Sequence, residues 1–145
     1  MEKQDVLIEI CNQQTIDGES EKIEMRVYGT ICALDGGFLV EYTEYDADAR
    51  PCRTTVRAVG DSMVSVVREG DCGGEMLFET GKRNATVYNT PYGALTMGVY
   101  TKYVENTLCA NGGRLHFCYT TDFHAQAGIE NRMTLTVSAQ ESEKK

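Results

Sequence analysis

Apolar and polar side chains alternate along several stretches of this chain, with the period of two that is typical of half-buried β-strands. Ile23, Met25, Val27 and Ile31 share one face of such a stretch, and their neighbours are mostly polar. The same alternation recurs in segments 38–44, 64–68, 95–103, 115–123 and 133–137. No window has the i, i+3, i+4, i+7 spacing of an amphipathic helix, so we predict no long helix.

Turn-forming residues separate these stretches at nearly regular intervals, because Asp-Gly, Gly-Gly and Pro-x-Gly sequences supply the backbone angles of tight hairpins. The clusters lie at 17–18, 35–37, 46–51, 60–61, 70–74, 81–84, 91–93, 110–113 and 125–128. Short connections without intervening helices predict an antiparallel meander. We therefore expect an all-β, up-and-down antiparallel β-barrel of eight to ten strands, which would also remove exposed strand edges.

One domain accounts for the whole pattern, because no gap is long enough for a linker in a chain of 145 residues. We place this single barrel domain at residues 1–139. The tail at 140–145 is polar and carries no strand pattern, so it is expected to be disordered.

Charge argues against two classes of partner. Asp and Glu number 22 against 14 Lys and Arg, for a net charge of −8, and the densest basic group is Lys82-Arg83. An acidic chain without a basic patch is repelled by phosphate, which disfavours nucleic acids and anionic membrane surfaces. The sequence also has no signal-peptide segment and no run of about 20 apolar residues, so a cytoplasmic location is expected.

The six cysteines are expected to be free thiols, since reducing compartments suppress disulfides. No C-x-x-C pair occurs that would indicate a redox or zinc motif. Small apolar filler is the favoured interpretation of these residues, and a reactive thiol or a metal ligand is the alternative. They are Cys11, Cys32, Cys52, Cys72, Cys109 and Cys118.

A family resemblance rests on two blocks, Phe78-Glu79-Thr80-Gly81 and the run Tyr-Asn-Thr-Pro-Tyr-Gly-Ala-Leu at 88–95. Segment 64–70 precedes them at the expected distance, and 113–115 opens a later strand that contains Tyr119. From about residue 8 to 137, the chain resembles the YwiB-like family of small bacterial proteins, a domain of unknown function. The resemblance implies a calycin-like, or lipocalin-like, β-barrel, and it implies no activity, catalytic set or ligand.

A barrel of this kind has a lumen that is able to hold one small ligand. Polar or aromatic residues on the faces expected to line it are the candidate ligand-binding residues. These are Tyr42, Glu44, Arg68, Phe78, Tyr88, Thr90, Tyr92, Thr101 and Tyr119. Apolar walls with a few placed polar groups are typical of ligand pockets. Tyr and Thr also favour strands without any ligand, and a Glu44–Arg68 pair could be structural.

The position of Tyr92 depends on the turn at 90–93, where Pro91 and Gly93 suit a tight connection. A structural turn is the favoured interpretation, and a rim or lid at the barrel mouth that presents Tyr92 is the alternative.

Catalytic chemistry has little support in the sequence. His116 and His124 would share a strand face about 26 Å apart at ~3.3 Å per residue, too far to bind one metal ion. The common nucleotide, hydrolase and metalloprotease motifs do not occur. We therefore predict no catalytic residues, no metal and no cofactor, and an enzyme is the less favoured class. Cys–His catalysis stays open, because its partners meet only in space.

Our leading hypothesis is a binding protein that holds a small, partly apolar molecule in the lumen, as a monomer or a homodimer. The alternative is a structural or protein-interaction module whose barrel is filled by its own side chains. A cryptic hydrolase or isomerase comes third.

Overall fold

The computed structural model describes residues 3–45, 48–69, 74–90, 93–123 and 128–140, and the side chains of 88–90 are outside this description. It is built from antiparallel strands, as the alternation predicts. The strands are β1 (Lys3–Ile16), β2 (Glu19–Leu34), β3 (Gly37–Tyr45), β4 (Pro51–Val59), β5 (Met63–Glu69), β6 (Gly74–Glu79), β7 (Arg83–Thr90), β8 (Gly93–Asn106), β9 (Gly112–Asp122) and β10 (Ile129–Ala139).

Neighbours in sequence are neighbours in the sheet, in the order β6-β5-β4-β3-β2-β1-β10-β9-β8-β7. The first and last strands close the barrel through a long antiparallel ladder, from Val6 opposite Ala139 to Thr15 opposite Glu130. At the other junction, the described residues contain no backbone ladder between β6 and β7. The predicted up-and-down barrel is therefore confirmed, with ten strands and a nearly complete closure.

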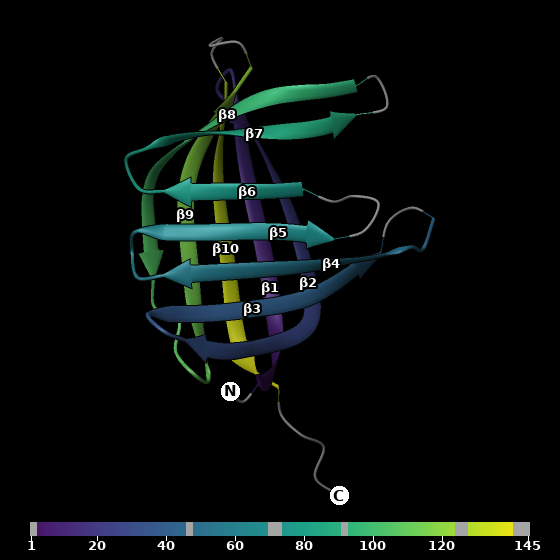
Figure 1. Ribbon diagram of the computed structural model, residues 1–145, viewed down its shortest axis with the longest axis vertical. Coiled ribbons are helices and arrows are strands. Elements are labelled where there is room, and N and C mark those ends of the chain that lie inside the picture. Colours follow the sequence, from purple (N-terminus) through teal and green to yellow (C-terminus); the bar gives the residue numbers. More distant parts are fainter. Residues whose placement is uncertain (1–2, 46–47, 70–73, 91–92, 124–127, 141–145) are drawn as a thin grey trace, which may run out of the picture.

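Two long strands, β2 and β8, belong to both layers of the barrel. β2 pairs with β1 from Glu19 to Cys32, but with β3 only from Gly29 to Leu34. Figure 1 shows β3, β4, β5 and β6 crossing in front of β1, β9 and β10, with β2 bending from one layer into the other. Gly29 lies at this bend, where a Cβ atom would come within 2.1 Å of the Glu41 carbonyl oxygen.

Local turn chemistry sets the register of the hairpins. Asp17 and Gly18 have positive φ angles of 51° and 82°, which is the conformation of a two-residue type I′ turn. Ile16 and Glu19 flank this turn as directly opposed residues, and the β1–β2 register continues from them without a shift. The Asp-Gly signal in the sequence therefore predicts this hairpin correctly.

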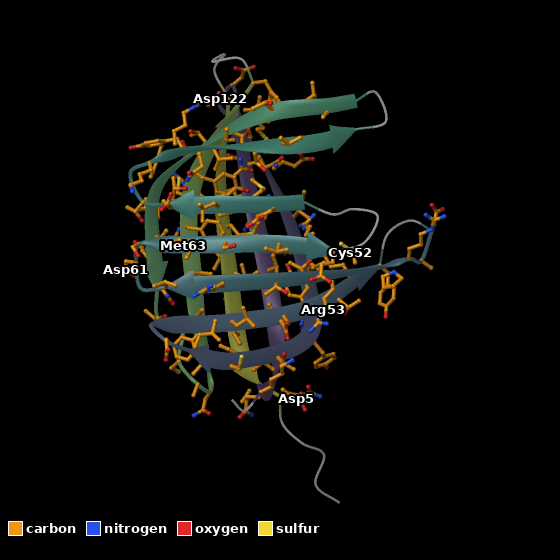
Figure 2. The ribbon with its side chains drawn as sticks, viewed as in Figure 1. Asp5, Cys52, Arg53, Asp61, Met63 and Asp122 are labelled. Carbon is orange, nitrogen blue, oxygen red and sulfur yellow. The ribbon has the colours of Figure 1, made fainter. Side chains whose placement is uncertain are left out.

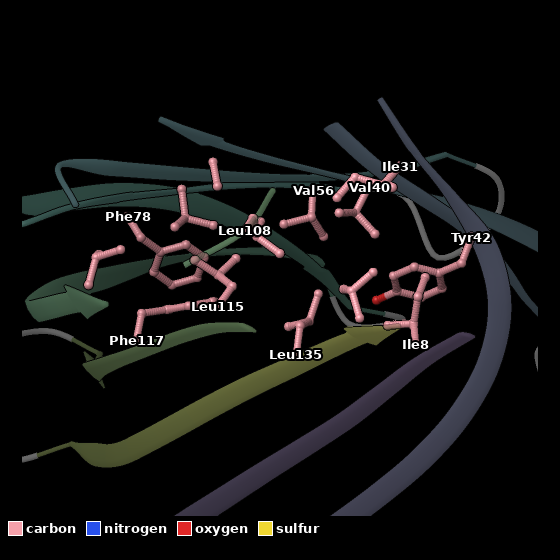
Figure 3. Packing of buried hydrophobic residues seen from close by; sticks show 14 of the residues in the cluster. Ile8, Ile31, Val40, Tyr42, Val56, Phe78, Leu108, Leu115, Phe117 and Leu135 are labelled. Carbon is pink, nitrogen blue, oxygen red and sulfur yellow. The ribbon is translucent and has the colours of Figure 1, made fainter. Parts of the chain in front are cut away.

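The inner faces of the strands meet in one apolar cluster. Its largest fully buried side chains are those of Phe117, Ile8, Ile31, Leu115, Val6 and Val40. Figure 3 shows Tyr42 at one end of this cluster, beside Ile8, and Phe78 and Phe117 at the other end. The alternating apolar positions therefore fill the centre of the barrel with side chains.

One face assignment in β8 is wrong. The sequence pattern places Tyr103 on the same face as Val99 and Thr101, but a β-bulge shifts the register between Thr101 and Tyr103. Because a bulge adds one residue to one strand, Val104 takes the buried position instead, with 5% exposure. The Tyr103 hydroxyl lies 3.2 Å from His116 Nε2, and His116 Nδ1 lies 2.8 Å from Thr134 Oγ1.

The cysteine prediction also needs one correction. Cys11, Cys32, Cys109 and Cys118 are free thiols, but Cys52 is disulfide-bonded. Cys72 lies outside the described residues. The spacing of cysteines along a chain does not show which of them approach in space, because a disulfide requires only that the two Cβ atoms lie close together. In the described part of the chain, no helix is long and apolar enough to cross a membrane.

Candidate functional site: a polar cluster on the inner face

Three neighbouring strands bring polar residues together in one cross-strand row. Tyr42 on β3 lies opposite Thr54 on β4, and Thr54 lies opposite Arg68 on β5. Figure 2 shows Cys52 and Arg53, which directly precede Thr54, at the end of β4 that is remote from Asp61 and Met63. The row therefore lies on the inner face of β3, β4 and β5, near the end of β4 that carries Cys52.

Glu44 links the members of this row. Its Oε2 atom accepts a hydrogen bond from Thr54 Oγ1 at 3.3 Å and lies 3.9 Å from Arg68 Nη2. The side chain of Arg68 is 48% exposed and that of Glu44 is 27% exposed, whereas Tyr42 is buried and Thr54 is fully buried. The ion pair that the sequence suggested is thus present, at the boundary between the core and solvent.

Tyr119 on β9 packs its ring against Phe78 and Phe117 in the core, and we group it with this row only because the charge of Arg68 lowers the pKa of Tyr119 as it does that of Tyr42. We call Tyr42, Glu44, Thr54, Arg68 and Tyr119 the polar cluster. They come from four strands, and four of the five are candidates predicted from the sequence.

Both tyrosines of the polar cluster keep their protons over the physiological range. Burial raises the pKa of Tyr42 to about 12, the Glu44 carboxylate adds to this effect, and Arg68 and a hydrogen bond with Thr54 reduce it. Burial likewise raises the pKa of Tyr119 to about 12, against an opposing effect of Arg68. The cluster thus combines neutral phenols, a carboxylate and a guanidinium.

This arrangement places several hydrogen-bond donors beside one another. A guanidinium carries several N–H donors in a planar fork, and the Glu44 carboxylate lies 3.9 Å from one nitrogen of the Arg68 group. Neutral tyrosines add O–H donors at the buried side. A small acceptor such as a carboxylate or phosphate group would match these donors.

The other predicted residues have different surroundings. Phe78 packs its ring against Tyr119 and Phe117, with centroids 4.6 and 4.8 Å apart, so it is part of the filled core. Thr101 is fully buried, and its Oγ1 atom has no hydrogen-bond partner among the described residues. Tyr88 and Thr90 lie on β7 opposite Leu95 and Gly93, with side chains outside the described residues, as is all of Tyr92.

A separate hollow lies at the junction of β6 and β7. It is a partly open cleft of about 420 Å³, and its walls include Glu75 and Leu77 on β6 and Val99 on β8. Two side chains of β7 bridge it, because Thr86 Oγ1 donates to the Glu75 carbonyl at 2.6 Å and Asn84 Nδ2 donates to the Leu77 carbonyl at 3.3 Å. The residues that line this cleft include none of those predicted from the sequence.

Sequence reasoning missed Thr54, Asn84 and Thr86. Thr54 alternates with Cys52 and Val56, so its inward direction was visible in the sequence, but its partner Glu44 lies on another strand. Asn84 and Thr86 are important only because β6 and β7 are not paired, and no local signal indicates which strands will face each other. In the part of the chain that the structure describes, no group of three or more His, Cys, Asp or Glu side chains is placed to hold a metal ion.

Comparison with known proteins gives the family. The family model described as "Domain of unknown function (DUF1934)" matches residues 8–135, which is most of the chain. The chain belongs to the DUF1934 family.

Two further similarities agree with this assignment. The chain is 27% identical over 122 residues to the "Uncharacterized beta-barrel protein YwiB" of Bacillus subtilis (strain 168), covering 84% of this chain and 83% of that protein. It also matches the crystal structure of the ywiB protein from Bacillus subtilis with a TM-score of 0.84 and 22% identity, over 96% of this chain and 94% of that one. The second similarity shows the fold, and the resemblance found in the sequence is confirmed.

Proposed function

We propose that this DUF1934 protein is a binding protein, and that its polar cluster holds the acidic group of a small, partly apolar molecule. The single observation that supports this most is Arg68. Its guanidinium belongs to the inner face of the barrel, is half-exposed, and has an ion-pair contact with Glu44 that is long, at 3.9 Å. Because the half-exposed guanidinium is only loosely paired, an anionic ligand could replace water as its hydrogen-bond partner.

The neighbours of Arg68 favour a ligand that also has an apolar part. Val66 precedes Arg68 by two residues on the same face, and Met76 lies opposite Val66. Both side chains are only partly buried and pack on the core cluster. A molecule that places its acidic group at Arg68 would therefore rest its apolar part on these side chains, with Tyr42 and Tyr119 as donors beside it.

Thermal-shift measurements test this proposal. The probes are straight-chain and aromatic monocarboxylates, each compared with its primary amide, which has the same shape without the charge. A ligand that binds the folded state raises the Tm by mass action. At least one carboxylate should raise the Tm of the wild type, and its amide should have a clearly smaller effect.

The matched variants are Arg68→Gln and Arg57→Gln, which remove the same charge from opposite faces of the barrel. Arg57 is exposed and precedes the buried Ala58 of β4, so it points away from the lumen. Arg57→Gln should keep the carboxylate effect, and Arg68→Gln should lose it. Equal effects in both variants, or no effect of any carboxylate on the wild type, would refute the proposal.

The alternative function is a structural or protein-interaction module, and the filled centre of the barrel favours it. Leu115, Ile8 and Val40 have no exposed surface, so a ligand would have to bind beside the core and not within it. Native mass spectrometry of protein purified from its own host separates the two functions. The binding function predicts a retained small molecule, and the alternative predicts the chain alone or a protein complex.

A cytoplasmic location is part of the proposal. Four free thiols and an acidic surface support it, and the disulfide of Cys52 opposes it. Cys109 is free and exposed, which allows a direct test with a maleimide that does not cross membranes. Labelling of Cys109 only after cell lysis would support a cytoplasmic location, and labelling in intact cells would contradict it.

A further inference from the structure

Among the described residues, the first half of β2 has no strand partner on one of its two sides. Its residues 19–28 pair with β1 on one side, whereas β3 begins to pair only at Gly29. This free edge is longer than a whole typical strand of about 5–6 residues, and it contains no proline. Exposed edges of this length are templates for pairing with another strand, and monomeric proteins usually protect them.

The hairpin geometry identifies the backbone groups that the free edge presents. Ile16 and Glu19 flank the two-residue type I′ turn, so they exchange both of their hydrogen bonds with each other. The alternation of an antiparallel ladder then directs the odd-numbered residues of β2 toward β1. The N–H and C=O groups of the even-numbered residues, from Ser20 to Tyr28, therefore point outward.

The side chains of this edge are exposed and alternate in charge. Lys22, Glu24 and Arg26 follow one another on the outer face, and all three are exposed. Arg26 forms an ion pair with Glu9 at 3.6 Å, whereas Lys22 and Glu24 have no ion pair within the described part of the chain. On the inner face, Ile23 is 57% exposed. An alternating charge pattern is complementary to itself when two copies run antiparallel.

We propose that this edge pairs with the same edge of a second copy of the chain, with Ile23 opposite the partner's Ile23. In this register, Lys22 lies opposite the partner's Glu24, and Glu24 opposite the partner's Lys22. The symmetry repeats each ion pair, and the even-numbered residues exchange backbone hydrogen bonds on both sides of the axis. The two Ile23 side chains cover one another.

Shifting the register by two residues in either direction is unfavourable. One shift places Glu24 opposite the partner's Glu24, and the other places Lys22 opposite the partner's Lys22. A centre at Met25 would pair Glu24 with the partner's Arg26. That register, however, directs the partner's hairpin turn onto positions from Gly29 onward, which β3 already occupies. In the Ile23 register, by contrast, the partner's hairpin turn lies beside Tyr28.

Charge-reversal variants test both the pairing and its register. Lys22→Glu and Glu24→Lys each convert the two proposed ion pairs into repulsions, so each should raise the dimer Kd by roughly ten- to a hundredfold. An equimolar mixture of the two variants should restore wild-type association, because each heterodimer has opposite charges at both pairs. Sedimentation velocity over a concentration series measures these affinities, with Lys82→Glu as the control that has the same charge change as Lys22→Glu.

Hydrogen exchange gives a second measurement on the wild-type chain. The amides of Lys22, Glu24 and Arg26 should exchange more slowly in the wild-type dimer than in either variant, since they donate across the interface. The proposal is overturned if the wild type is monomeric throughout the series, if both variants associate as tightly as the wild type, or if mixing does not restore association. These outcomes do not depend on whether the polar cluster binds a ligand.

Discussion

The centre of the inner face and the polar cluster beside it come from the same alternating positions of the same strands, yet their side chains have different partners. In the centre, Phe117 and Leu115 contact only other protein side chains and have almost no exposed surface. In the polar cluster, Arg68 is 48% exposed and has a contact of 3.9 Å with Glu44. The side chains of the centre are enclosed by protein, whereas Arg68 in the polar cluster stays half-exposed to solvent.

The difference separates the side chains that should determine stability from those that we propose bind a ligand. Burial of apolar area stabilises the centre, so a substitution there should act on folding. The groups at the cluster are half in solvent, where an ion pair contributes little to stability. A substitution there should act on binding, and the two kinds of variant should be separable by experiment.

The largest expected effect is that of Phe117→Ala in the centre. Phe117 is 1% exposed and packs against Phe78, so the substitution leaves a cavity and should lower the free energy of unfolding by about 3–5 kcal/mol. Arg68→Ala should lower it by no more than about 1 kcal/mol. Urea unfolding measures both, and comparable losses in the two variants would remove the distinction between centre and cluster.

The next effect concerns alkaline pH. Burial raises the pKa of Tyr119 from 10.0 to about 12 in the folded state, while the unfolded chain keeps the ordinary value. Below pH 10 both states hold the proton and stability is complete. Above it, the unfolded state releases its proton first, so stability falls as the pH rises toward 12, by about 3 kcal/mol for this group.

Tyr119→Phe isolates this contribution, because the ring stays and the titrating hydroxyl is lost. Urea unfolding between pH 8 and 12 should show a weaker alkaline decline in the variant than in the wild type. The tyrosine absorbance of the folded wild type should titrate correspondingly late. Identical declines in both proteins would mean that Tyr119 is more accessible to water than its burial indicates.

The smallest change in stability is expected at Thr101, which the sequence analysis predicts to be a ligand-binding residue. Its hydroxyl is fully buried without a hydrogen-bond partner among the described residues. Thr101→Val keeps the shape and removes this unpaired group, so stability should rise by about 1 kcal/mol. Carboxylate binding should be unchanged. If Thr101→Val lost carboxylate binding, the binding site would have to include the centre of the barrel.

Much of the fold could be predicted from local signals. The alternation in 38–44 and 64–68 defines the inner faces, and Asp17-Gly18 defines a hairpin that the structure confirms. Three features could not be predicted in this way: the disulfide of Cys52, the bulge after Thr101, and the junction of β6 and β7, which has no backbone ladder in the described residues. No local pattern encodes these, because each depends on how one segment is placed against another in the folded chain.

The site was predictable to a similar degree. Inward polar residues stand out against an apolar face, which predicts Tyr42, Glu44, Arg68 and Tyr119. The structure gathers the first three around Thr54, whereas Tyr119 packs on Phe78 and Phe117 and is linked to them only through the effect of the Arg68 charge on its pKa. Phe78 and Thr101 carry the same signal and lie in the filled core instead. Alternation shows which face a residue occupies. It does not show how far along the barrel that face remains open to solvent.

Binding at the polar cluster is tested most directly by a chemical-shift titration of isotope-labelled protein with the carboxylate that raises the Tm most. We predict that the largest shifts occur at Tyr42, Glu44, Thr54, Arg68 and Tyr119, and that Glu75 and Thr86 at the β6–β7 cleft are unaffected. Shifts concentrated at the cleft, or no saturable shifts at all, would contradict the claim that the polar cluster is the binding site.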